Sequence, residues 1–291
     1  MKILVLGATG MLGGSLLRYF ADKTEHDVYG TVRDSKAESR LVSKANANII
    51  CGIDVHNVNK IRSIIEEVKP DYVINCVGVV KQLKESKFPI HSITINSLLP
   101  HRLAEICSHN NSKLIHFSTD CVFSGNRGDY SVNDVPDAFD LYGRSKLLGE
   151  VSYAPHLTLR TSIIGHEQGS QHSLIDWFLN QSGEVKGFTK AVFSGVPTVY
   201  MAELLNNYVF TNPDITGLYQ VSVEPIDKYS LLSLVKEIYG KDIDIHADDS
   251  LVINRSLNST EFKIRTGMNT PSWKDLIEKM YNEYRTYFQK A

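Results

Sequence analysis

The chain has 291 residues, of which 42% are hydrophobic and 22% charged, and 31 Lys and Arg against 33 Asp and Glu give a formal net charge of −2. This composition is typical of a globular protein and excludes a wholly disordered chain, while the near-zero charge gives no sign of nucleic-acid or membrane binding. Four cysteines without a C-x-x-C spacing fit neither a zinc site nor a disulfide framework. No signal peptide or membrane-spanning run is recognisable, so we expect a cytoplasmic protein.

Strand-like and helix-like stretches alternate along the first 165 residues. Apolar runs predict strands at 2–6, 27–32, 48–53, 72–76, 113–117 and 157–162, and helical spacing of apolar residues predicts helices at 11–22, 57–68, 92–109 and 143–152. Short strands that alternate with longer helices are typical of right-handed βαβ units. The pattern predicts an α/β fold with a doubly wound parallel Rossmann sheet.

This alternation stops after residue 165. We expect helices near 172–181, 200–211, 228–239 and 272–289, one more strand at 217–222 and a β-like stretch near 243–253. No Pro-rich linker or charge block separates the two parts, so we expect them to pack together. We assign residues 1–165, with 197–222 returning to them, to a Rossmann domain, and 166–196 and 223–291 to a smaller interleaved C-terminal α+β part.

A glycine-rich turn, G-x-x-G-x-x-G, follows the first predicted strand at residues 7–13. Glycines let the backbone turn tightly and approach a pyrophosphate, and the helix N-terminus supplies free N–H groups and a partial positive charge. Because the turn lies between a buried strand and a helix, it predicts a dinucleotide site. The expected contacts are Gly7, Thr9, Gly10, Met11, Leu12 and Gly13.

The end of the second predicted strand bears on the choice between NAD and NADP. An acidic residue there binds the ribose 2′-hydroxyl of NAD, whereas an Arg favours the 2′-phosphate of NADP. Thr31 replaces the acid and Arg33 lies just beyond the strand, which favours NADP, although the adjacent Asp34 leaves NAD open. The residues expected to contact the cofactor after the third and fourth strands are Asp54, Val55, Cys76, Val77 and Gly78.

Tyr142 and Lys146 stand four residues apart and therefore share one face of a predicted helix. A tyrosine hydroxyl has a pKa of about 10 in model peptides, and a nearby ammonium group lowers that pKa toward neutrality, where the side chain exchanges protons. The lysine can also reach the nicotinamide ribose. Ser118 and Thr119 follow the fifth strand, where a hydroxyl can bind a substrate carbonyl. Asn96 either orients the lysine through a water or lies on a helix surface.

These motifs resemble those of the extended short-chain dehydrogenases/reductases and, within them, the dTDP-4-dehydrorhamnose reductase branch. The resemblance implies an NADP-dependent oxidoreductase that reduces a nucleotide-linked 4-keto-6-deoxy sugar for surface polysaccharide precursors. It implies a catalytic triad of Thr119, Tyr142 and Lys146, with Ser118, Asn96, Tyr142 and Lys146 among the cofactor contacts. The matching segments are the glycine turn, Ser118-Thr119-Asp120-x-Val122-Phe123-x-Gly125, Tyr142-x-x-x-Lys146, Leu159-Arg160-Thr161-Ser162 and Val196-Pro197-Thr198.

The resemblance is weakest where the sugar and the nucleotide base would bind, so dTDP-linked and UDP-linked sugars both remain open. We expect substrate contacts at Lys81, Thr119, Asp120 and Ser162, and no metal ion. Basic or amide groups of the C-terminal part, with Arg255 as one candidate, are expected to bind the diphosphate. Cys121 stands where related dehydratases carry an acid, and a thiol with a pKa of about 8.5 is a poor substitute, which disfavours dehydration.

Two alternative functions stay open within this resemblance. One is a nucleotide-sugar epimerase of the same superfamily, which uses its tightly bound cofactor transiently. The other is a non-catalytic NADP-binding regulatory subunit, like that of methionine adenosyltransferase. The intact set of Thr119, Tyr142 and Lys146 favours an enzyme over a binding subunit. Extended members of the superfamily often form dimers, and the predicted helix at 143–152 is a candidate homodimer interface.

Overall fold

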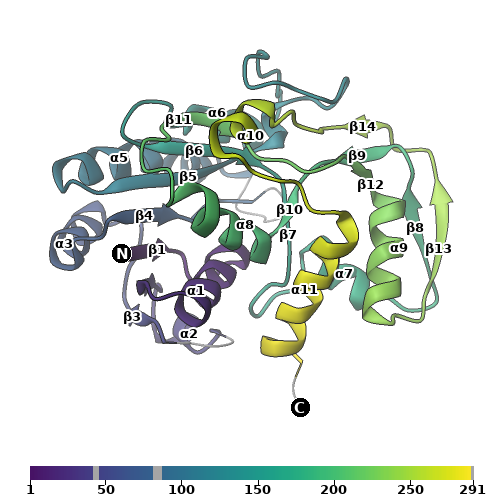
Figure 1. Cartoon of the computed structure of the whole chain (residues 1–291), viewed down its shortest axis with the longest axis horizontal. Coiled ribbons are helices and arrows are strands. Elements are labelled where there is room, and N and C mark those ends of the chain that lie inside the picture. The colour runs from purple at the N-terminus through teal and green to yellow at the C-terminus, as the bar shows by residue number, and fades with distance from the viewer. Residues whose placement is uncertain (42–45, 81–86, 290–291) are drawn as a thin grey trace.

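The computed structural model describes residues 1–41, 46–80 and 87–289, and a seven-stranded sheet forms its centre (Figure 1). The strands of this sheet are β1 (Lys2–Leu6), β2 (Asp27–Thr31), β3 (Asn48–Ile50), β4 (Tyr72–Asn75), β5 (Lys113–Thr119), β6 (Leu157–Thr161) and β11 (Gly217–Gln220). They lie in the order β11-β6-β5-β4-β1-β2-β3, and every neighbouring pair is parallel. The predicted doubly wound Rossmann sheet is confirmed.

Helices connect the strands and cover both faces of the sheet (Figure 1). They are α1 (Met11–Lys23), α2 (Ser35–Glu38), α3 (Val58–Val68), α4 (Pro89–Ser92), α5 (Leu99–His109), α6 (Leu141–Leu148), α7 (Leu174–Leu179), α8 (Thr198–Leu204), α9 (Lys228–Tyr239), α10 (Thr260–Thr266) and α11 (Trp273–Tyr287). The π-helical segments η2 (Ile93–Leu98) and η4 (Leu205–Val209) continue α4 and α8, and the 3-10 turn η3 (Asp120–Val122) follows β5. Within the described ranges, none of these helices is both long and apolar enough to cross a membrane.

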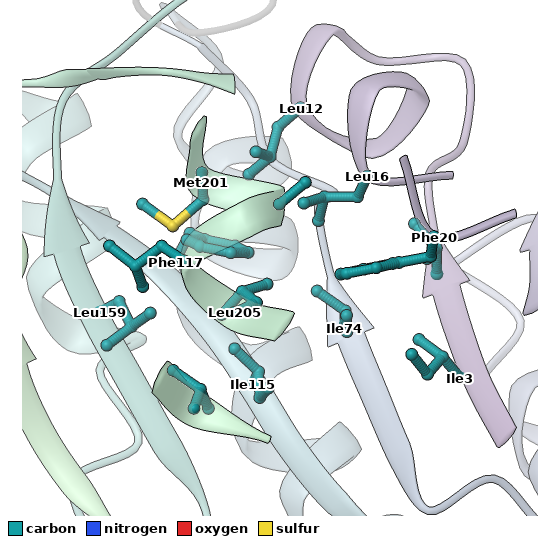
Figure 2. Packing of buried hydrophobic residues seen from close by; sticks show 14 of the residues in the cluster. Ile3, Leu12, Leu16, Phe20, Ile74, Ile115, Phe117, Leu159, Met201 and Leu205 are labelled. Carbon is teal, nitrogen blue, oxygen red and sulfur yellow. The ribbon is translucent and has the colours of Figure 1, made fainter. Parts of the chain in front are cut away.

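The two faces of the sheet bury separate apolar cores. Side chains at alternate positions of a strand point to opposite faces, so Ile3 packs on the side of α1 and α8, and Leu4 on the side of α3 and α5. Figure 2 shows the first core, where Leu16 and Phe20 of α1 and Met201 of α8 meet the sheet. Because the strands are buried on both sides, their sequences read as continuous apolar runs.

The predicted helix at 92–109 is interrupted in the structure. It consists of α4, η2 and α5 in succession. Pro100 has no N–H to donate to the carbonyl of Asn96 four residues earlier, so the chain widens to a π-helical register at this point. The predicted helix at 143–152 also differs: α6 starts at an Asp140 cap and ends at Leu148.

The chain after residue 165 adds a third apolar core at the side of the sheet. Its residues lie between Ile164 and Met280 and come from α7, α9, α11 and short strands. The sequence predicts the helices of this part except α10, but of its strands only the stretch near 243–253, because strands of two to five residues give too short an apolar pattern to recognise. These strands are β7 (Ile163–Ile164), β8 (Glu184–Phe188), β9 (Ala191–Phe193), β10 (Val196–Pro197), β12 (Ile226–Asp227), β13 (Asp244–Asp248) and β14 (Ile253–Asn254).

Helix α11 ties this third core to the Rossmann sheet, and Figure 1 shows it between α1 and α9. A buried ion pair joins α11 to α1, with Arg18 Nη2 at 2.6 Å from Glu283 Oε1. Ser15 Oγ donates to the same carboxylate oxygen at 2.7 Å, and the Arg18 guanidinium lies over the rings of Tyr287 and Phe288. A buried network of side chains therefore joins the last helix, α11, to the first, α1.

Candidate functional site

A cavity of about 700 Å³ lies at the carboxyl ends of β1, β4, β5 and β6. Open α/β sheets bind ligands at this edge, where the strand order reverses between β1 and β4. The cavity brings together the predicted cofactor turn and the predicted proton-transfer residues. The sequence-predicted residues that line it are Gly10, Met11, Leu12, Cys76, Val77, Gly78, Ser118, Thr119, Asp120, Tyr142, Lys146 and Ser162.

The glycine turn has the geometry that a dinucleotide needs. Gly7 has a φ of +83°, which only glycine adopts without strain, and its N–H donates to Thr31 Oγ1 at 3.2 Å. A Cβ on Gly13 would lie 2.2 Å from the Gly7 carbonyl oxygen, so a side chain there would force α1 away from the turn. Gly10 begins α1 without a side-chain cap. The first turn of α1 is thus open to an anion such as a pyrophosphate.

The end of β2 carries no acidic side chain that faces the turn. Thr31 is buried and its hydroxyl accepts the Gly7 N–H. Asp34 caps α2, because its carboxylate accepts the Ala37 N–H at 2.7 Å. Arg33 is exposed beyond the strand and does not line the cavity.

Several predicted contacts lie outside the cavity. Asp54 belongs to a separate hollow of about 540 Å³ at the start of α3, beside Arg102, and Val55 packs against the second core. Gly7, Thr9 and Gly13 belong to the turn but do not line the cavity. Lys81 lies outside the described residues.

Asn96 is buried between the turn after β4 and α6. It is 1% exposed, its Oδ1 accepts the Val79 N–H at 2.9 Å, and its Nδ2 donates to the Val79 carbonyl at 3.1 Å and to Ser145 Oγ at 3.2 Å. The prediction of a surface position is wrong, because η2 turns this side chain inward. Asn96 holds the turn after β4, which lines the cavity, against α6.

Thr119, Tyr142 and Lys146 meet at the end of β5. The Thr119 hydroxyl hydrogen-bonds Tyr142 and also donates to Asp120 Oδ1 at 3.1 Å. Lys146 is 6% exposed, and its Nζ donates to the Phe117 carbonyl at 2.6 Å. One turn of α6 therefore places a phenol and an ammonium group against the same strand end.

Burial dominates the ionisation of these side chains. It raises the pKa of Tyr142 above its usual value, and the hydrogen bond from Thr119 only partly offsets this rise. The sequence-based expectation of a lowered tyrosine pKa is therefore not met in the chain alone, because burial and the nearby acidic groups Cys121, Asp120 and Asp140 all raise this pKa. A protonated phenol is the form that can donate a proton, which is what a reduction requires. Burial likewise lowers the pKa of Lys146 to about 8, against the opposing effect of Glu150.

The lowered pKa of Lys146 predicts a pH dependence of stability. Between pH 8 and the ordinary lysine value of 10.5, the folded chain has lost the proton that the unfolded chain still binds, so stability rises with pH. We expect the free energy of unfolding, relative to Lys146→Met, to rise by about 3 kcal/mol over this window. Urea unfolding of both variants at several pH values measures it. A pH-independent difference would contradict the burial of a charged lysine here.

Ser118 has a structural partner behind the cavity. Its hydroxyl donates to Glu150 Oε1 at 2.6 Å, and Arg160 binds both oxygens of that carboxylate at 2.7 Å. The Arg160–Glu150 pair is almost fully buried. The Leu-Arg-Thr-Ser segment, which the resemblance singles out, thus positions β6 and the end of α6 next to β5.

Other cavity residues belong to no motif, and of these the sequence names only Arg255 as a candidate for binding a diphosphate. Arg255 and Lys228 line the cavity from the C-terminal part. The charge of Arg255 lowers the pKa of the buried Asp120 carboxyl, and the charge of Asp120 raises the pKa of Lys228. Burial raises the pKa of Asp120, and the Arg255 charge opposes this rise. Burial raises the pKa of the Cys121 thiol to about 12, so it stays protonated. Loop residues that also line the cavity are Glu167, Ser170, His172 and Ser173.

Comparisons with known proteins agree with these features. The family model of the RmlD substrate binding domain matches residues 1–186. The chain is 26% identical to the dTDP-4-dehydrorhamnose reductase of Escherichia coli K12, over 98% of this chain and 99% of that protein. It is 27% identical to the methionine adenosyltransferase 2 subunit beta of Bos taurus, over 51% of this chain and 41% of that subunit.

A solved structure shows the same fold. The dTDP-4-dehydrorhamnose reductase of Bacillus anthracis, in complex with NADP, is 19% identical and matches with a TM-score of 0.79 over 97% of this chain and 99% of that one. The family model covers well over half of the chain and includes every motif up to the Ser162 segment. The chain therefore belongs to the RmlD substrate-binding-domain family, in the dTDP-4-dehydrorhamnose reductase branch of the extended short-chain dehydrogenases/reductases.

Proposed function

We propose that this protein is an NADPH-dependent reductase of a nucleotide-linked 4-keto-6-deoxy sugar in the synthesis of surface polysaccharide precursors. The observation that carries this proposal is that Thr119, Tyr142 and Lys146 line the same cavity as the glycine turn. A cytoplasmic location follows from the cofactor and nucleotide sugar that such a reaction consumes. Residues 1–165 and 197–222 would hold the cofactor, and 166–196 and 223–291 the sugar nucleotide.

The chain's own residues supply the proton and its electrostatic support. Bound NADPH would supply a hydride to C4 of the keto sugar. Tyr142, kept protonated by burial, donates its proton to the oxygen at C4, while the Thr119 hydroxyl hydrogen-bonds the same oxygen. Lys146 would hold the nicotinamide ribose of the cofactor, and its charge stabilises the phenolate that remains on Tyr142. The carbonyl thus gains a hydride at carbon and a proton at oxygen.

The cofactor is NADP in this proposal. The first turn of α1 would bind the pyrophosphate, and Gly10, Met11 and Leu12 line the cavity there. The 2′-phosphate would meet Arg33 at the end of β2, where Thr31 replaces the acid that selects NAD. Stronger binding of NADH than of NADPH would reverse this choice.

Arg255 and Lys228 are proposed to bind the negatively charged substrate. Lys228→Met should raise the KM for the sugar nucleotide by about 10- to 100-fold, the usual effect of losing a charge-assisted hydrogen bond. The Kd for NADPH should stay within about twofold. Lys236→Met, further along α9 and paired with Asp244 at the surface, is the matched control. Equal KM values for the two variants would remove Lys228 from the substrate site.

A screen of keto-sugar nucleotides tests the proposed function. Both dTDP-linked and UDP-linked 4-keto-6-deoxy sugars are offered, and loss of NADPH absorbance is followed. The proposal expects at least one substrate to consume NADPH in a 1:1 ratio. An epimerase would convert the sugar without net oxidation of NADPH. A regulatory subunit would consume none and would bind a partner enzyme stably.

A homodimer is proposed through an apolar patch beside α6. The patch comprises Ile90, Ile93, Leu98, Leu148 and Tyr153, all more than 40% exposed, on α4, η2 and α6, which contact one another, and in the chain that follows α6. Sedimentation should give twice the chain mass of 32.7 kDa, and Leu148→Glu should give the single mass. Val252→Glu, an exposed apolar site outside the patch, should leave the dimer intact. A monomeric wild-type chain would contradict the proposal.

A further inference from the structure

A side chain from outside the Rossmann sheet reaches the glycine turn. Gln168 lies in the loop between β7 and α7 and is 5% exposed. Its Nε2 donates a hydrogen bond at 3.1 Å to the carbonyl oxygen of Ala8, 160 residues earlier in the chain. The Ala8 N–H donates to the carbonyl of Thr31 at 3.1 Å. The sheet therefore holds the Ala8 N–H, and Gln168 holds the Ala8 carbonyl.

Gly14 makes room for this contact. A Cβ on Gly14 would lie 1.8 Å from Gln168 Nε2, 2.8 Å from its Cδ and 3.2 Å from the Ala8 oxygen. A glycine within a helix is less stable than alanine by about 1 kcal/mol, and Gly14 is not one of the three glycines of the turn motif. Its place in α1 is explained by the amide of Gln168, which occupies the space of a side chain.

The loop that carries Gln168 is tied to the wall of the cavity. Asp176 Oδ2 accepts the Glu167 N–H at 2.7 Å, and Asp176 Oδ1 lies 2.6 Å from His166 Nδ1. Glu167 Oε2 accepts the His172 N–H at 2.7 Å. Glu167 and His172 both line the cavity. The loop thus contacts the glycine turn at one point and faces the substrate side of the cavity with the rest.

We propose that Gln168 is a positioning residue that couples the dinucleotide turn to the substrate wall of the cavity. By holding the Ala8 carbonyl, it sets the peptides that lead into α1 and so aims the free N–H groups at the pyrophosphate. The same hydrogen bond keeps loop 165–173 against the cavity. This inference rests on the proposed function, since it assigns the turn to a nicotinamide dinucleotide.

Titration of the chain with NADPH, with no sugar present, tests this role of Gln168. Gln168→Ala leaves the buried Ala8 carbonyl without its partner, and we expect the Kd for NADPH to rise about tenfold. The KM for the keto sugar should rise with it, whereas kcat at saturation should stay within about twofold, because Tyr142 and Thr119 are untouched. Gln171→Ala, exposed in the same loop and outside the cavity lining, is the control.

A double-mutant cycle separates this contact from a general loss of packing. Gly14→Ala alone should weaken NADPH binding as much as Gln168→Ala, because the new methyl group displaces the amide. The double variant should bind NADPH no more weakly than Gln168→Ala alone, so the two effects on the Kd are not additive. Thermal unfolding without NADPH is recorded for each variant. Gln168→Ala should unfold at a temperature a few degrees below that of Gln171→Ala, and NADPH binding is compared at a temperature where all variants are folded.

The outcomes distinguish this inference from the proposed function. A wild-type chain that binds NADPH and a Gln168→Ala variant that binds it equally well would overturn the inference and leave the proposed function standing. Additive effects of Gly14→Ala and Gln168→Ala would overturn it as well. A wild-type chain that binds no nicotinamide dinucleotide would overturn both.

Discussion

Tyr142→Phe should lower kcat by a factor of about 10³ while leaving the Kd for NADPH within about twofold, because general acid catalysis contributes about 10²- to 10⁴-fold. The substitution removes only the hydroxyl that hydrogen-bonds Thr119 and donates the proton. The ring remains in the cavity, so the cofactor site keeps its shape. Single-turnover oxidation of NADPH, together with a fluorescence titration of NADPH, measures both quantities.

Tyr29→Phe is the matched control for this effect. Its hydroxyl is exposed and donates to Asp27 at 3.1 Å, and its ring packs outside the cavity. It should have wild-type turnover. Near-wild-type turnover in Tyr142→Phe would remove the proton donor from the mechanism and with it the catalytic assignment.

Glu283→Ala should lower the free energy of unfolding by about 3–5 kcal/mol, the usual cost of leaving one partner of a buried ion pair alone. The Arg18 guanidinium is 2% exposed in the pair, and its Nε and Nη1 have no hydrogen-bond partner among the described residues. Loss of the carboxylate leaves the buried charge of Arg18 without its partner and removes the ion pair that joins α11 to α1. Urea unfolding measures this loss of free energy. Thermal unfolding should show a midpoint that is lower by roughly 10 °C.

Two comparison variants isolate the buried charge. Glu278→Ala, exposed on the same helix, should change the stability by less than about 0.5 kcal/mol. The double variant Arg18→Met, Glu283→Met should be more stable than Glu283→Ala, because apolar side chains of similar size replace a pair whose atoms are only partly satisfied. A single and a double variant of equal stability would show that packing, and not the stranded charge, sets the loss.

The sequence alone locates those site residues that lie close to one another along the chain. Gly7 and Gly13 stand in one turn whose conformation their residue type dictates, and Tyr142 and Lys146 stand on one helical turn. Residues such as these need no knowledge of distant contacts. The doubly wound parallel sheet follows in the same way, because alternation of strands and helices restricts the topology.

The parts that escape prediction depend on contacts over long separations. Lys228 reaches the cavity from the C-terminal part, and no spacing marks it as different from a surface cation. Arg255 is a candidate from the sequence by its charge alone, and only the structure places it at the cavity. Gln168 is one polar residue in an irregular loop. Only the structure shows that its amide lies over Gly14 and donates to the Ala8 carbonyl. Asn96 has the pattern of a helix surface, but the π-helical register turns it inward. Periodicity assumes regular helices, so it fails at such a position.

Transfer of deuterium from NADPH to the sugar distinguishes a reductase from an epimerase and from a binding subunit. The chain is incubated with NADPH that carries deuterium at both positions of C4 of the nicotinamide and with the keto-sugar nucleotide that the screen identifies, and the product is examined by NMR. We expect one deuterium at C4 of the hexose for each NADP⁺ formed, and a rate that falls with Tyr142→Phe. A product without deuterium, or a sugar converted with no NADPH consumed, would contradict it.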